Sequence, residues 1–95
     1  MKTEELNMKM MIIIVRDSDA DEVVTELVSQ GYRVTRMSST GGFLKRGNIT
    51  LLVGVNGEKI DAVMELLKRT CCPSEDKEQH RATIFVTDMP FFAQI

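Results

Sequence analysis

An uninterrupted apolar segment near the N-terminus, residues 10–15, constrains the fold of this chain more than any other feature. Its isoleucine and valine side chains favour an extended strand, and its lack of polar residues indicates that both faces of the strand are covered. Asp17, Ser18 and Asp19 follow directly, and these are residue types that end strands and cap helices. We therefore expect the central strand of a sheet, leading at once into a helix.

A helical pattern begins directly after this strand. The spacing i, i+3, i+4, i+7, i+8 of an amphipathic helix is met by Ala20, Val23, Val24, Leu27 and Val28. Ser18 or Asp19 is the expected N-cap, and Gly31 stands where the helix is expected to end. The sequence therefore predicts a first helix from Asp19 to Gly31.

The remaining sequence predicts three further strands and a second helix. The strands are expected at residues 32–38, 49–55 and 82–87, and the first two are expected to pair as antiparallel neighbours. The second helix is expected to begin at Asn56 and to end near Cys71, because Pro73 follows. Its apolar stripe consists of Ile60, Val63, Met64 and Leu67.

This order of elements, βαββαβ, predicts an α+β fold of the ferredoxin-like type. Two right-handed split βαβ units give an antiparallel four-stranded sheet with both helices on one face. A chain of 95 residues supports one core, so we expect a single domain over residues 10–95. Residues 1–9 are mostly polar and charged and lack a period, so we expect a flexible N-terminal extension.

The face of the sheet opposite the helices is expected to be too apolar for water. It would carry one side of the strand at residues 10–15 together with Arg33, Thr35, Met37, Leu52 and Phe85. We expect that copies of the chain cover this face for one another. Clefts between subunits are then the expected place for a small ligand.

Composition and motifs argue against several functions. The net charge of -2 gives no broad basic surface, so we expect neither nucleic acid nor a membrane as partner. No apolar run approaches the roughly 20 residues of a membrane span, and we expect a cytoplasmic protein. Cys71 and Cys72 are adjacent, and His80 is the only histidine and has no second ligand at metal spacing. We therefore expect no enzyme, no metal site and no cofactor.

A glycine-rich segment, Thr40, Gly41 and Gly42, is the best candidate for a binding site. Its glycines allow successive backbone amides to face one anion. Arg33 and Thr35 leave the preceding strand on one face and can add a cation and a hydroxyl to the same phosphate. Apolar faces for a base are offered by Phe43, Leu44 and Phe85. The side-chain amide of Asn48 has the donor and acceptor that an adenine edge can match.

Each of these residues also has a structural explanation. Two adjacent glycines between strands often form only a turn, and Asn48 after Gly47 is common turn chemistry. Arg33 can be a solvated or interface cation, and Phe43 and Phe85 can belong to the core. The spacing of the glycines matches neither a P-loop nor a dinucleotide-binding fingerprint.

The sequence GYRVTRMSSTGGFLKRGNITLLVGVN at residues 31–56 resembles the PII-like cyclic-di-AMP receptor family of bacterial signalling proteins. The resemblance extends through IIIVRD at residues 12–17 and ATIFV at residues 82–86, and includes Phe92 and Gln94. It implies a homotrimer of ferredoxin-like subunits with ligand sites in the clefts between subunits. It also implies signalling by loop rearrangement when a nucleotide second messenger binds.

The resemblance implies roles for particular residues. Arg33 and Thr35, with the backbone of Phe43 and Leu44, would contact the phosphates. Asn48 and Gly54 would bind an adenine edge. Phe85 and Gln94 would close the pocket.

The leading hypothesis is a non-catalytic signalling protein that binds cyclic-di-AMP or a related adenine nucleotide and has a protein target. The alternative is a trimeric protein-interaction module without a nucleotide ligand. This alternative is favoured by the connection at residues 70–80, which is shorter than in family members that bind cyclic-di-AMP. Amino-acid-binding ACT domains share the topology, but the residues from Thr40 to Asn48 favour phosphate as the ligand.

Overall fold

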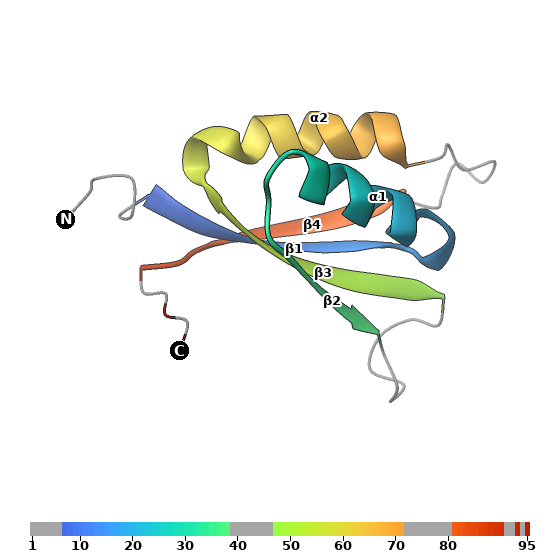
Figure 1. Cartoon of the computed structure of the whole chain (residues 1–95), viewed down its shortest axis with the longest axis horizontal. Coiled ribbons are helices and arrows are strands. Elements are labelled where there is room, and N and C mark those ends of the chain that lie inside the picture. The colour runs from blue at the N-terminus through green and yellow to red at the C-terminus, as the bar shows by residue number, and fades with distance from the viewer. Residues whose placement is uncertain (1–6, 39–46, 72–80, 91–92, 94) are drawn as a thin grey trace.

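Two helices pack on one face of a four-stranded antiparallel sheet (Figure 1). The structure is a computed structural model, and it describes residues 7–38, 47–71, 81–90, 93 and 95. In chain order the elements are β1 (Met8–Arg16), α1 (Asp17–Ser29), β2 (Val34–Ser38), β3 (Asn48–Asn56), a 3-10 turn η2 (Gly57–Lys59), α2 (Ile60–Thr70) and β4 (Ala82–Asp88). The strand order in the sheet is β2-β3-β1-β4. The predicted ferredoxin-like topology is therefore confirmed.

The central strand of the sheet is β1, as its apolar sequence predicts. It pairs antiparallel with β3 along one edge and with β4 along the other. Met11, Ile13 and Val15 point toward the helices and are at most 1% exposed. Ile12 and Ile14 point to the opposite face and are half-buried. The apolar run thus supplies side chains to both faces of the sheet.

The sheet extends further toward the N-terminus than the sequence indicated. Met8 and Lys9 were expected in the flexible extension, but they form the first residues of β1, with Met8 opposite Asn56 and Lys9 opposite Asp88. Backbone pairing with two neighbouring strands explains why a strand continues through a lysine. The remainder of the expected extension, residues 1–6, lies outside the described residues.

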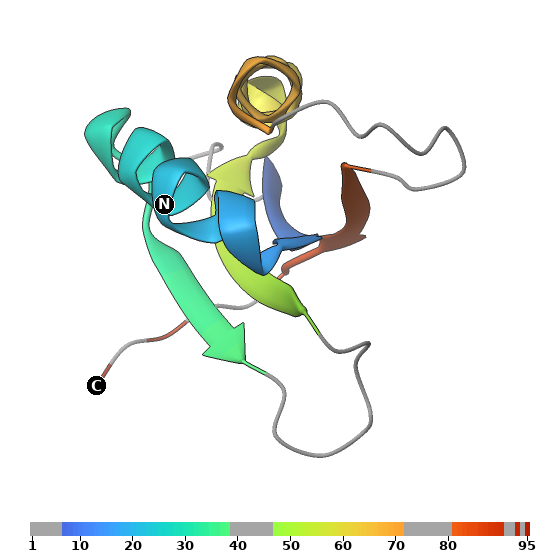
Figure 2. The same cartoon turned by 90° about the vertical axis from the view of Figure 1, so that its right-hand side faces the viewer.

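The helices cover the sheet through narrow apolar stripes. Figure 2 shows both helices on the same side of the sheet. In α1 the side chains of Ala20, Val23 and Leu27 are fully buried. Val28 was expected in this stripe but is 57% exposed, because it lies about 100° around the helix from Leu27. In α2 the buried side chains are Val63, Leu66, Leu67 and Thr70.

The start of α1 differs from the sequence prediction. The helix begins at Asp17, its N-cap is Arg16, and the Arg16 side chain makes no capping hydrogen bond. Neither Ser18 nor Asp19 is the cap, because the strand runs into the helix without a linker and the cap position falls on the last strand residue. Asp19 is instead buried and accepts hydrogen bonds from Nε and Nη2 of Arg16, at 3.0 and 2.8 Å.

The end of α1 agrees with the prediction. Gly31 has a φ of 89°, a backbone conformation that residues with a side chain rarely adopt. Its amide donates to the carbonyl of Val28 at 3.0 Å, and the amide of Tyr32 donates to the carbonyl of Leu27 at 3.1 Å. These two hydrogen bonds form a Schellman motif, which ends the helix and turns the chain toward β2.

We predict that Gly31→Ala lowers the free energy of unfolding by about 1–2 kcal/mol, because a side chain strains the positive φ. No atom lies within 4 Å of the position that the new Cβ would take, so the loss reports the backbone and not a clash. Urea unfolding measures it, with Glu22→Ala on the exposed face of α1 as control, expected within about 0.5 kcal/mol of the wild type. Equal stability of Gly31→Ala and the control would contradict the account of the helix end.

Candidate functional site

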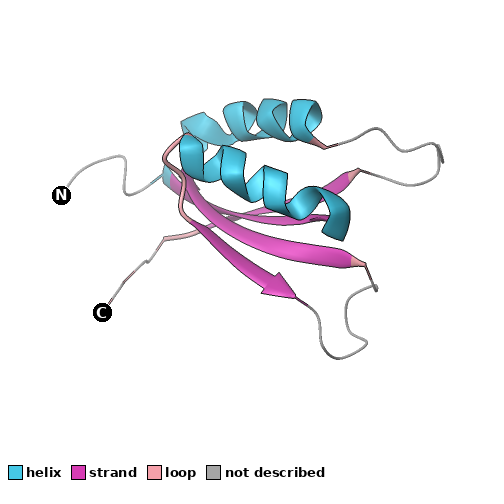
Figure 3. Ribbon diagram, turned by 45° about the vertical axis from the view of Figure 1, so that its right-hand side comes forward, coloured by secondary structure: helices cyan, strands magenta, loops and turns pink. Residues whose placement is uncertain are grey.

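The face of the sheet opposite the helices carries the described site residues that the sequence predicted. Thr35 lies opposite Leu52, Leu52 opposite Ile12, and Ile12 opposite Phe85, so one row of side chains crosses all the strands. Paired residues in antiparallel strands project from the same face. No described helix covers this face, as Figure 3 shows. We call it the open face of the sheet.

A pocket of about 520 Å³ lies at one end of the open face, where β1 begins and β4 ends. This volume is within the range of small-molecule sites, roughly 300–1,000 Å³. Arg33, Thr35 and Gly54 all line it, and Arg33 and Thr35 are exposed. The strand expected at residues 32–38 begins only at Val34, so Arg33 lies directly before β2, yet the chain still brings together three residues that the sequence predicted for one site.

Asn48 and Phe85 were predicted for the same site, but the chain does not bring them to this pocket. Asn48 pairs with Arg16 at the opposite end of β3 from Gly54, about 20 Å away at the usual rise of a strand. Phe85 lies on β4 and Thr35 on β2, the two outer strands, about 14 Å apart at the usual strand spacing. One chain thus forms only part of the predicted site.

The other predicted site residues lie outside the described residues. They are Thr40, Gly41, Gly42, Phe43, Leu44 and Gln94. Cys72 and His80 also lie there, whereas Cys71 is buried at the end of α2. The predicted roles of these residues therefore remain predictions.

The pocket is also lined by three methionines that were not predicted as site residues, namely Met8, Met10 and Met89. Met8 and Met10 lie two residues apart in β1 and so share the open face. Met89 directly follows β4, and its amide donates to the carbonyl of Met8 at 3.0 Å. The alternation in β1 could have revealed Met10, but Met8 was assigned to the extension and no sequence signal places Met89.

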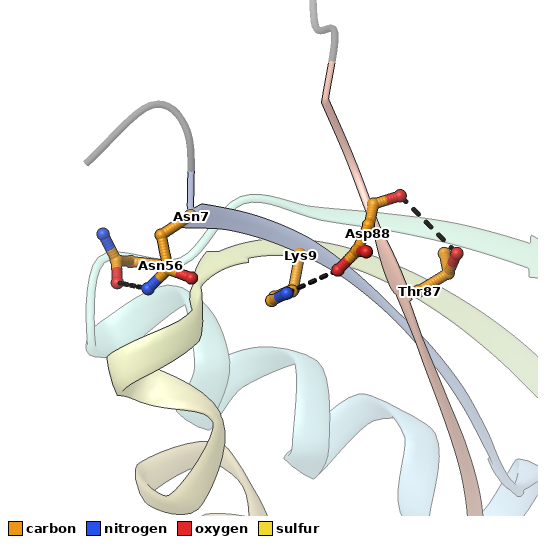
Figure 4. Close-up of polar contacts among 5 residues, drawn as sticks. All are labelled: Asn7, Lys9, Asn56, Thr87 and Asp88. Carbon is orange, nitrogen blue, oxygen red and sulfur yellow. Dashed lines mark hydrogen bonds and ion pairs between the residues drawn. The ribbon is translucent and has the colours of Figure 1, made fainter. Parts of the chain in front are cut away.

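Polar contacts hold the chain at this end of the sheet (Figure 4). Nδ2 of Asn7 donates to Oδ1 of Asn56 at 3.2 Å, and the same oxygen accepts from the amide of Glu58 at 3.0 Å. Nζ of Lys9 forms a hydrogen-bonded ion pair with the carboxylate of Asp88. This hydrogen bond and the positive charge of Lys9 lower the pKa of Asp88 below its usual value. The contacts connect the start of β1 to the ends of β3 and β4.

Within the described part of the chain, no group of three or more histidine, cysteine, aspartate or glutamate side chains is arranged to hold a metal ion. No helix in the same part is both long enough and apolar enough to cross a membrane.

Comparison with known proteins adds to this geometry. The two-layer βαββαβ arrangement places the chain in the class of small ferredoxin-like α+β domains. Residues 8–94 match the cyclic-di-AMP receptor family, and the chain belongs to that family. The resemblance predicted from residues 31–56 is therefore confirmed.

Several solved structures have a fold similar to that of this chain. A protein of unknown function from Pediococcus pentosaceus is 30% identical, with a TM-score of 0.78 over 95% of this chain and 99% of its own. The PII protein of Arabidopsis thaliana, solved with citrate, is 21% identical with a TM-score of 0.67, over 87% of this chain and 78% of its own. GlnK of B. subtilis, solved with ATP, is 17% identical with a TM-score of 0.67, over 87% and 82%. The chain thus has the PII-type fold.

We predict that the contact between Lys9 and Asp88 stabilises the fold at neutral pH and is lost in acid. Because the pKa of Asp88 is lower in the folded state, its contribution is full above the unfolded pKa of about 3.9 and falls away below it. The difference in unfolding free energy between the wild type and Asp88→Asn, measured between pH 7 and pH 3, should shrink toward zero as the pH falls. A difference that stays constant over this range would contradict the prediction.

Proposed function

We propose that this protein is a non-catalytic signalling receptor that binds cyclic-di-AMP or a related adenine nucleotide in clefts between the subunits of a homotrimer. The observation that carries the proposal is the meeting of Arg33, Thr35 and Gly54 around one pocket, in a member of the cyclic-di-AMP receptor family. The proposed function is binding alone, so no residue is assigned a catalytic role.

The phosphates are bound by the start of β2 and the residue before it. Thr35 lies on β2, Arg33 directly precedes this strand, and both line the pocket. A guanidinium can donate two parallel hydrogen bonds to a phosphate, and a threonine hydroxyl can donate a third. The backbone of Phe43 and Leu44 and the Thr40, Gly41 and Gly42 segment complete this end of the site.

The adenine is bound by Gly54 and Asn48, with Phe85 and Gln94 closing the pocket. One chain holds Gly54 and Asn48 about 20 Å apart, too far for one base. A neighbouring subunit in the trimer therefore supplies the groups that a single chain does not bring to its own pocket. The proposed cleft between subunits brings such groups together from two chains.

The open face is proposed as the trimer interface. One row of side chains crosses this face in the order Thr35, Leu52, Ile12 and Phe85, and we call it the central row. Phe85, at its end, is 56% exposed. A continuous apolar row of this kind is costly to leave in water. Binding of the nucleotide then shifts the population of loop conformations, and a protein target in the cytoplasm recognises the change.

A second candidate is a trimeric interaction module without a nucleotide ligand. The short connection between α2 and β4 favours it, because α2 ends at Thr70 and β4 begins at Ala82. Under this alternative, deletion of residues 91–95 abolishes capture of a partner while nucleotides have no effect. Under the leading proposal, nucleotides change the capture.

We predict that Arg33→Ala loses about 1.5–3 kcal/mol of binding free energy, roughly 10- to 150-fold in Kd, because a charge-assisted phosphate contact is removed. Calorimetry with cyclic-di-AMP, ATP, ADP and AMP measures it. Arg36→Ala is the matched control, because Arg36 lies nearby on β2, points to the helix side and pairs with Asp21. Binding by Arg36→Ala should equal that of the wild type. A wild-type protein that binds none of these nucleotides at high micromolar concentration would refute the proposal.

The proposed trimer predicts a specific response to charge on the open face. Ile12→Glu places a carboxylate in the middle of the central row, and we expect it to dissociate the trimer because a buried unpaired charge is costly. Val28→Glu is the control, since Val28 is exposed on the helix side. Sedimentation velocity should give a trimer for the wild type and Val28→Glu, and a monomer for Ile12→Glu. A monomeric wild type would contradict the assembly.

A further inference from the structure

We propose that Met8, Met10 and Met89 form a thioether wall that contacts the flat face of the bound nucleobase. This inference rests on the proposed function, which it extends by three binding residues. The methionine side of the pocket then binds the base, and the side with Arg33 and Thr35 binds the phosphates.

The three thioethers converge from β1 and from the residue that directly follows β4. Met8 and Met10 point to the open face from β1, and Met10 lies opposite both Gly54 and Thr87. Met89 is held beside Met8 by its backbone hydrogen bond of 3.0 Å. All three side chains are partly exposed and line the same pocket.

Gly54 lies beside the end of the Met89 side chain. A Cβ added to Gly54 would lie 3.2 Å from Cε of Met89, so the methyl group of Met89 rests against this glycine. Met89 follows β4, whereas Gly54 lies on β3, with β1 between the two strands. The side chain of Met89 therefore reaches across the open face above β1 as far as Gly54.

The pocket has two chemically different sides. Thr35 on β2 and Arg33 directly before it line one side, and the thioethers line the other side from β1 and from the residue after β4. The strands β2 and β1 are two strand spacings apart, about 10 Å, and Leu52 on β3 forms the apolar floor between them. A nucleotide has the same division, with charged phosphates at one end and a neutral flat base at the other.

Thioethers suit the face of a base. Sulfur and methyl groups of methionine are polarisable and make favourable contacts with aromatic rings, and the flexible side chain adapts to the ring it meets. Such contacts do not depend on the hydrogen-bonding edge of the base. The wall therefore adds affinity for any purine, and discrimination of adenine is left to the groups that bind its edge.

The first test is NMR on the full-length protein labelled at the methionine methyl groups. Cyclic-di-AMP should shift the methyl resonances of Met8, Met10 and Met89 upfield, because the ring current of a stacked base acts on nearby methyl groups. Met64 on α2 lies on the helix side and is the internal control, with no expected shift. Ribose 5-phosphate is the base-free probe, and it should leave all three methyl resonances in place.

The second test uses variants in calorimetry with cyclic-di-AMP. Met89→Ala should weaken binding about five- to tenfold through loss of contact with the ring, whereas Met89→Leu should stay within about threefold of the wild type. If the wild type binds while the three methyl resonances do not shift and Met89→Ala binds equally well, the inference is overturned and the proposed function stands. If the wild type does not bind, both the proposed function and this inference fail.

Discussion

The structure depends on the antiparallel pairing of β1 with both of its neighbours. This pairing places Ile12 between Leu52 and Phe85, so a single register fixes which residues face the helices and which form the open face. A shift by one residue would send the core side chains Met11 and Ile13 to the open face and remove the helix-side core. The fold and the candidate site therefore depend on the same register.

The pocket follows from where the strands end. Since β1 starts at Met8 and β4 stops at Asp88, the side chains of the strand ends gather at the same edge as Arg33. The pair of Lys9 and Asp88 holds that edge from the helix side of the sheet. The pocket therefore has a cationic side at Arg33 and an apolar side at the methionines, with Leu52 between them. The proposed ligand comes from the family to which the chain belongs.

Sequence patterns predicted the features that depend on local chemistry. The isoleucine run identified the central strand, and the glycine at residue 31 identified the end of α1, where φ is 89°. Alternation in the strand expected at residues 32–38 placed Arg33 and Thr35 on one face, and both line the pocket although β2 begins only at Val34. Asn48 and Gly54 lie on one strand, and their sequence spacing with the usual rise of a strand gives a separation of about 20 Å, so this distance could have been foreseen from the sequence. Met89 could not be predicted, because its contact with Gly54 spans three strands.

The central claim is that an adenine nucleotide binds at the Arg33 end of the open face, between subunits. A crystal structure of the protein grown with cyclic-di-AMP tests it most directly. The account predicts density for the ligand in a cleft of a trimer, with phosphate at Arg33 and Thr35 and a base over Gly54. Ligand density on the helix side of the sheet, or a trimer whose clefts contain no ligand at saturating concentration, would contradict the account.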